Sequence, residues 1–70
     1  MVEKTIELTG TSTNSIEDAV GLAVNRASAT IAGIRQAEVR GITATIEDGQ
    51  VTAWRVKVHV SFAVQDRVHE

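Results

Sequence analysis

The side chains that could perform chemistry lie in the second half of the chain, where acidic, basic and imidazole groups alternate with apolar residues. A carboxylate beside an imidazole can transfer protons as an acid–base pair. Arginine and lysine side chains can bind the phosphate or carboxylate group of a ligand, and the planar guanidinium is especially suited to it. Which chemistry is available depends on which groups share one surface. The candidates are Glu38, Arg40, Arg55, Lys57 and His59.

The stretch from Trp54 to Val64 carries three of these groups and has the clearest structural pattern in the chain. Every second residue in it is apolar, while most of the residues between are polar. This period of two predicts a β-strand with one buried face and one solvated face. Because the run is the longest of its kind and rich in β-branched residues, we expect it to be the central strand of a sheet.

The other elements follow from similar patterns. Alternation predicts a first strand over residues 2–9, and apolar residues at steps of three and four predict a helix from Ile16 to about Ala32. Gly33 is expected to end that helix in the left-handed conformation. A second long strand is expected over residues 34–46. The pair Asp48-Gly49 predicts a two-residue type I′ turn that joins it to the last strand.

The order of these elements predicts an α+β fold. The first strand can pair antiparallel with the last, which gives a β-α-β-β arrangement, with a three-stranded antiparallel sheet in the order 1-3-2 wrapped around one helix. Two residue pairs are candidates to cap the start of the helix, Asn14 with Glu17 and Ser15 with Asp18. A length of 70 residues without a linker predicts a single domain over residues 1–70.

The turn also predicts which residues of the hairpin face one another. On the inner face, Ala37, Val39, Gly41 and Thr43 would lie opposite Val60, Val58, Val56 and Trp54. On the outer face, Gln36, Glu38, Arg40 and Ile42 would lie opposite Ser61, His59, Lys57 and Arg55. Trp54 is therefore expected to pack in the core or in an interface, and the alternative is that the strand end twists outward so that Trp54 stacks on a ligand.

In this register the outer face gathers positive charge, since Arg40 lies opposite Lys57 with Arg55 close by. One interpretation is ordinary ion pairing with Glu3 and Glu7, from the first strand or from a neighbouring subunit. The other is a site for the phosphate or carboxylate group of a ligand.

Composition and pairing together disfavour several functional classes. Glu38 opposite His59 resembles an acid–base dyad, but no nucleophile stands in a recognisable relation to it, so no enzymatic activity is expected. The absence of cysteine, with two histidines, excludes a disulfide or a zinc cluster within the chain. A net charge of −2 from interspersed charges argues against nucleic-acid binding. The sequence has no apolar run typical of a signal peptide or a membrane span, which predicts a cytoplasmic protein.

A domain of this size buries only a marginal hydrophobic core of its own. We therefore expect self-association, in which neighbouring copies supply the missing core.

Four short motifs, in this order and spacing, resemble the dodecin family. They are Leu-Thr-Gly-Thr-Ser at residues 8–12, an alanine-rich helix with Ala27 after Arg26, Ala-Glu-Val at 37–39 and Val-x-Val-x-Phe at 58–62. The resemblance covers nearly the whole chain. It implies the fold predicted above, twelve subunits closing a hollow shell, and no catalysis. It also implies binding of flavins (riboflavin, FMN or FAD), stacked in pairs at subunit junctions for storage or sequestration.

At two positions the chain departs from the flavin-binding members of that family. It has Gln36 where they carry a tryptophan that stacks on the flavin ring, and Arg55 where they carry a glutamine that binds the polar edge of the ring. The implied site therefore comprises Gln36 and Arg55, with Glu38, Arg40 and Lys57 around them, and its ring stacking is weakened. Arg55 could contact a carbonyl edge of the ring or stack on it. The alternative is a dodecin shell that binds ions or has a structural role.

Overall fold

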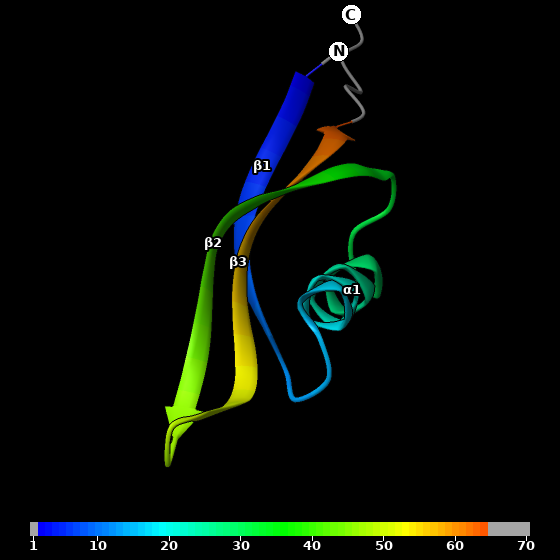
Figure 1. Ribbon diagram of the computed structural model, residues 1–70. Coiled ribbons are helices and arrows are strands. Elements are labelled where there is room, and N and C mark those ends of the chain that lie inside the picture. The colour runs from blue at the N-terminus through cyan, green and yellow to red at the C-terminus, as the bar shows by residue number, and fades with distance from the viewer. Residues whose placement is uncertain (1, 65–70) are drawn as a thin grey trace, which may run out of the picture.

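The computed structural model of the chain describes residues 2–64 as one helix and a three-stranded sheet (Figure 1). The sheet is antiparallel and its strand order is β1-β3-β2, which confirms the predicted β-α-β-β fold with β3 in the centre. The elements are β1 Val2–Ser12, α1 Ile16–Ser28, β2 Ile34–Glu47 and β3 Gln50–Val64.

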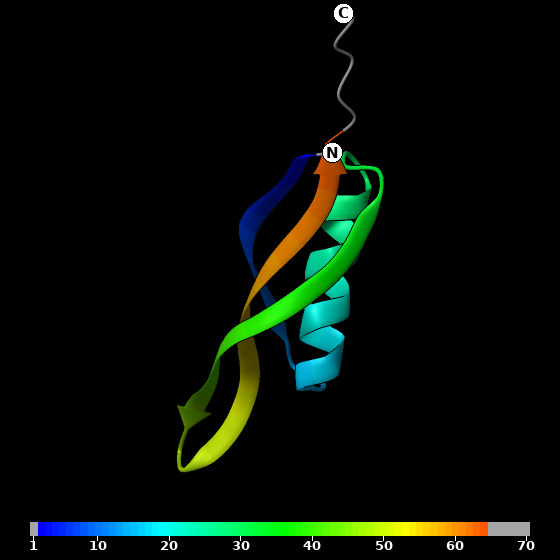
Figure 2. The same cartoon turned by 90° about the horizontal axis from the view of Figure 1, so that it is seen from above.

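The helix lies on one face of the curled sheet, which we call the inner face; the other is the outer face. Figures 1 and 2 show that the tip of the β2–β3 hairpin projects beyond the helix. The core between helix and sheet is small. Val56, Val58 and Val60 of β3 are fully buried, and Ala19 and Ala23 of α1 pack against them. Alanines at these positions allow the helix to approach the sheet closely.

The start of the helix is fixed by the turn after β1. The Ser15 hydroxyl oxygen accepts a hydrogen bond from the Asp18 backbone N–H at 2.9 Å, so the second of the two predicted capping pairs is the one that forms. Ser12 adds to this turn, because its hydroxyl donates to the Asp18 carboxylate at 2.6 Å. The same hydroxyl oxygen accepts from the backbone N–H of Asn14 at 2.9 Å.

Two predicted boundaries were wrong. Strand β1 does not end at Thr9 but continues to Ser12, which pairs with Trp54. Helix α1 ends at Ser28 rather than near Ala32, because the chain tightens there: the Thr30 N–H donates to the Ala27 carbonyl oxygen three residues back, at 3.1 Å. Gly33 has the expected left-handed φ of 77°, but it lies in the connection to β2 and does not end the helix.

The hairpin turn is as predicted. Asp48 and Gly49 have φ of 53° and 75°, and Glu47 pairs with Gln50 on either side of them. Positive φ at both central residues is the signature of the type I′ turn.

The predicted hairpin register holds only over part of its length. It is confirmed where Gln36, Ala37, Glu38 and Val39 pair with Ser61, Val60, His59 and Val58. Between Val39 and Ile46 it was wrong, because Arg40 is an extra residue in β2, which forms a β-bulge. Arg40 is therefore not opposite Lys57. In the stretch that follows, the pairs are Gly41 with Lys57, Ile42 with Val56, Thr43 with Arg55 and Ala44 with Trp54.

The bulge exchanges the faces of the residues that follow it. Gly41 and Thr43, expected on the inner face, lie beside Lys57 and Arg55 on the outer face, whereas Ile42 lies beside Val56 on the inner face. The register also shifts between Ile34 and Gln36 at the start of β2, and a further irregularity between Thr45 and Ile46, opposite Thr52, restores the pairing needed at the turn. The Thr52 hydroxyl donates to the Thr45 carbonyl oxygen there at 3.3 Å.

Trp54 is on the inner face, as predicted, and is half-buried between its sheet neighbours Ser12 and Ala44. Among residues 2–64, no helix has both the length and the apolar character needed to cross a membrane.

Candidate functional site

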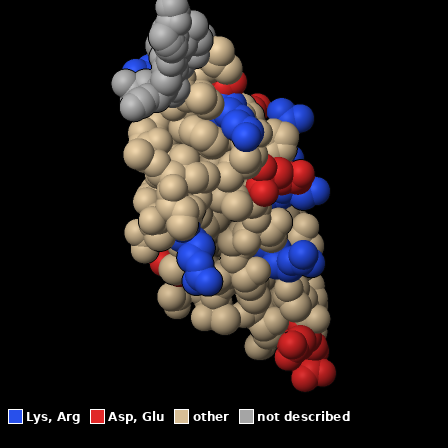
Figure 3. All heavy atoms as spheres, turned by 180° about the vertical axis from the view of Figure 1, so that it is seen from behind, with Lys and Arg blue, Asp and Glu red and all other residues tan. Residues whose placement is uncertain are grey.

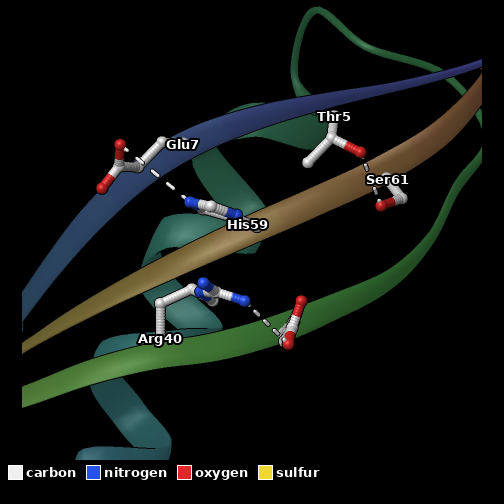
Figure 4. A network of polar contacts seen from close by, with 6 residues as sticks. Thr5, Glu7, Arg40, His59 and Ser61 are labelled. Atoms are coloured by element: carbon white, nitrogen blue, oxygen red, sulfur yellow. Dashed lines mark hydrogen bonds and ion pairs between the residues drawn. The ribbon is translucent and has the colours of Figure 1, made fainter.

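The outer face of the sheet carries a row of polar side chains from all three strands. Glu7 of β1 lies opposite His59 of β3, and its carboxylate is 4.0 Å from His59 Nε2 (Figure 4). The same carboxylate is 3.4 Å from the Lys57 ammonium nitrogen. The ion pairing predicted for Glu7 is therefore confirmed. Glu3 lies opposite Ala63, and no ion pair of it appears within the described part of the chain.

Glu38 and Arg40 form a separate pair on β2. The Arg40 guanidinium donates to the Glu38 carboxylate at 3.1 Å, and at least half of each side chain is exposed. Glu38 lies opposite His59 in the ladder, as predicted, yet His59 pairs with Glu7 on the other side. Next to His59 along the outer face, the Ser61 hydroxyl shares a hydrogen bond of 3.1 Å with Thr5 (Figure 4). The acidic and basic groups of this row thus form exposed ion pairs, and each such pair contributes little to stability.

Further along the outer face, towards the hairpin tip, the surface is hollowed. A half-open depression of about 220 Å³ lies over the three strands there. Two rows of the sheet form its floor. In one, Arg55 stands between Thr11 and Thr43, and in the other, Lys57 stands between Thr9 and Gly41. The lining residues are Thr9, Gly41, Thr43, Arg55 and Lys57.

The bulge at Arg40 creates this hollow, because it turns Gly41 and Thr43 to the outer face. Glycine leaves open the space beside Lys57, since a Cβ atom built on Gly41 meets no atom within 4 Å. The other four lining side chains end in groups that can donate hydrogen bonds. No acidic side chain lines the depression, and Glu7 compensates Lys57 from its border.

Basic and acidic side chains alternate along the sheet side of the molecule, at the right of Figure 3. Arg55 is an exception, because its positive charge is not compensated by a neighbouring carboxylate of the described residues. Its neighbours on both sides in the ladder are threonines, and no carboxylate of the described residues lies within ion-pairing distance of it.

The structure brings together only part of the predicted site. Arg55 and Lys57 line the depression, whereas Gln36, Glu38 and Arg40 do not. Gln36 lies opposite Ser61, six residues along β3 from Arg55, which corresponds to about 20 Å of extended strand. A single chain therefore does not place Gln36 and Arg55 against one small ligand.

The contribution of Thr9, Gly41 and Thr43 to the depression was not predicted from the sequence. The one signal available was Gly41 within a strand pattern, because glycine inside a strand often marks a bulge. For metals, the described residues contain no group of three or more His, Cys, Asp or Glu side chains placed to hold an ion.

The described residues thus define a small α+β protein with an alanine-lined helix, a long twisted hairpin and a basic depression on the outer face of its sheet. The sequence model of the Dodecin family matches residues 2–65. The chain belongs to the dodecin family.

Solved structures agree with this assignment. Dodecin from Streptomyces coelicolor is 35% identical, with a TM-score of 0.87 over 93% of this chain and 93% of that one. A variant of Thermus thermophilus dodecin is 34% identical, with a TM-score of 0.87 over 93% of this chain and 97% of that one. The calcium dodecin of Mycobacterium tuberculosis, described as having a calcium-binding site, is 31% identical, with a TM-score of 0.81 over 100% of both chains. No curated protein matches the sequence significantly.

Proposed function

We propose that this chain assembles into a homododecameric shell that binds a small molecule without catalysing a reaction, and that the ligand is a flavin held on the outer face of the sheet. The observation that carries the proposal is the basic depression at Arg55 and Lys57 in a chain of the dodecin family. Storage or sequestration in the cytoplasm would suit such a protein.

A flavin site of this kind requires more than one chain. Because Gln36 and Arg55 are about 20 Å apart along the sheet, a ligand that contacts both must lie where two subunits meet. Arg55 would supply donors to the carbonyl edge of the ring or stack on its face. Gln36 offers no aromatic surface, so stacking is weaker by about 1 kcal/mol on each side of the ring than with an aromatic partner.

Flavin titration tests the proposal. We expect the assembled protein to quench the fluorescence of riboflavin, FMN or FAD with modest affinity. We expect Gln36→Trp to increase that affinity by about thirtyfold, since about 1 kcal/mol on each side of the ring, about 2 kcal/mol together, corresponds to that factor. Gln50→Trp provides the control, because it adds the same aromatic group at the exposed hairpin turn. Unquenched fluorescence with both the wild type and Gln36→Trp would exclude a flavin site.

The second candidate is a shell that binds ions. It is favoured by the similarity to the calcium dodecin of Mycobacterium tuberculosis, which covers both chains completely. Isothermal titration with CaCl₂ separates the two functions. Saturable calcium binding by a protein that leaves all three flavins unquenched would support the ion-binding shell. Flavin quenching with no heat from calcium would support the flavin site.

A further inference from the structure

We propose that the depression lined by Thr9, Gly41, Thr43, Arg55 and Lys57 binds a phosphate group, either as free phosphate or as the end of a phosphomonoester. The inference rests on the proposed function in that it uses the same face of the sheet. It adds the chemical class of the group that this chain recognises there.

The donors in the depression match a tetrahedral oxyanion. Arg55 contributes a planar fork of N–H groups and Lys57 an ammonium group, while the hydroxyls of Thr9 and Thr43 can each donate one more hydrogen bond. These four side chains come from all three strands, so the sheet holds their backbones at fixed spacings. A phosphate group would therefore meet donors from several directions.

The charge of the depression also favours an anion. Arg55 lies between Thr11 and Thr43 and has no carboxylate partner among the described residues. Lys57 is 3.4 Å from the Glu7 carboxylate, but both side chains are at least half exposed, and such pairs are weak. The ammonium group has three donors, so it can bind an anion while it remains near Glu7.

The space is sufficient because the bulge places glycine at its border. The depression of about 220 Å³ is several times the roughly 30 Å³ that one water occupies in the liquid, so a phosphate group fits together with bridging waters. A side chain at Gly41 would extend into that space without first meeting protein atoms within 4 Å of its Cβ. Its backbone φ is not in the left-handed region, so a substitution there fills the hollow without local strain.

Isothermal titration of the assembled wild-type protein with inorganic phosphate, at constant ionic strength in a chloride buffer, tests the inference. We expect saturable binding that Arg55→Gln weakens at least about tenfold, as loss of a charge-assisted bidentate contact implies. Arg26→Gln is the matched control, because it removes the same charge from helix α1, outside the depression, and should leave the affinity within about twofold.

Gly41→Val tests whether the hollow itself matters. It retains every donor and charge, and we expect it to abolish phosphate binding by occupying the space. Circular dichroism and size-exclusion chromatography show whether each variant keeps its fold and assembly. Should Gly41→Val fail to assemble, Thr43→Val removes one donor with little change in volume and should weaken phosphate binding several-fold.

Glycerol phosphate and glycerol distinguish the two sources of the group. Binding of inorganic phosphate alone assigns a site for the free ion, and binding of both phosphates but not glycerol assigns one for phosphomonoesters. No saturable phosphate binding, or equal losses in Arg55→Gln and Arg26→Gln, would overturn the inference. Because riboflavin has no phosphate, its titration reports on the flavin proposal separately, and either proposal can fail while the other holds.

Discussion

Gly10 allows helix α1 to approach strand β1 closely, because it has no side chain. A Cβ atom on Gly10 would overlap the carbonyl oxygen of Ala19 and lie 3.1 Å from the Ala23 Cβ. Gly10 is opposite Val56, one of the three fully buried valines, so the contact lies in the core. Gly21 is different, since a Cβ atom there meets nothing within 4 Å although the residue lies mid-helix.

We therefore expect Gly10→Ala to lower the free energy of unfolding by about 1–3 kcal/mol, because the helix must move away from β1 and the core valines lose contacts. Gly21→Ala is the matched control. It should raise the same free energy by up to about 1 kcal/mol, because alanine is the better helix former and no atom obstructs it. Urea denaturation at one fixed protein concentration measures both. Equal effects of the two substitutions would show that Gly10 is not a close contact.

At the scale of the elements, the segment between β1 and α1 depends on one buried hydroxyl. Ser12 is 5% exposed, and its Oγ donates to the Asp18 carboxylate while accepting from the backbone N–H groups of Asn14 and, at 3.3 Å, Ser15. These bonds connect the last residue of β1 to the first turn of α1. They fix the direction in which the helix leaves the sheet.

Ser12→Ala should lower the free energy of unfolding by about 1–3 kcal/mol, because three partly buried hydrogen bonds are lost. Thr13→Ala is the control, because Thr13 is exposed. This substitution should change the free energy of unfolding by no more than about 0.5 kcal/mol. Thermal or urea unfolding followed by circular dichroism provides the comparison. If the two variants had the same stability, Ser12 would not be what holds this turn.

The elements were predictable from the sequence, whereas the bulge that shapes the candidate site was not. The period of two around Val58 and the pair Asp48-Gly49 each specify a local geometry, so the strand and the turn followed from them. Around Gly41 the pattern is compatible with the predicted register and with the register shifted by one residue, because both Gly41 and Thr43 fit either face of a sheet. The structure places one extra residue there, so the predicted positions of Arg55 and Lys57 relative to β2 changed while the fold did not.

At the scale of the whole molecule, much of the inner face is uncovered. The helix packs over Val56, Val58 and Val60, but the hairpin projects beyond it (Figure 2). The apolar residues Val39, Ile42, Ile46 and Val51 are there between 44% and 55% exposed. So much exposed apolar surface on so small a domain favours burial against further copies of the chain.

Ile42→Glu tests whether further copies of the chain cover this apolar surface of the hairpin. Ile42 pairs with Val56 and is 51% exposed, so glutamate is tolerated by the lone subunit but becomes a buried, unpaired charge once another copy covers the hairpin. Light scattering after size-exclusion chromatography should give about 90 kDa for the wild type, twelve times the 7.5 kDa chain, and a much smaller mass for Ile42→Glu.

Asn25→Glu is the control for this experiment, because it adds the same charge at an exposed position of α1, away from the hairpin. It should keep the wild-type mass. Unfolding supplies a second measurement: the midpoint of a wild-type assembly rises with protein concentration, whereas that of a dissociated Ile42→Glu subunit does not. An Ile42→Glu protein with the full wild-type mass would show that the inner face of the hairpin is not where the copies meet, and the assembly would then have to use the outer face or the helix.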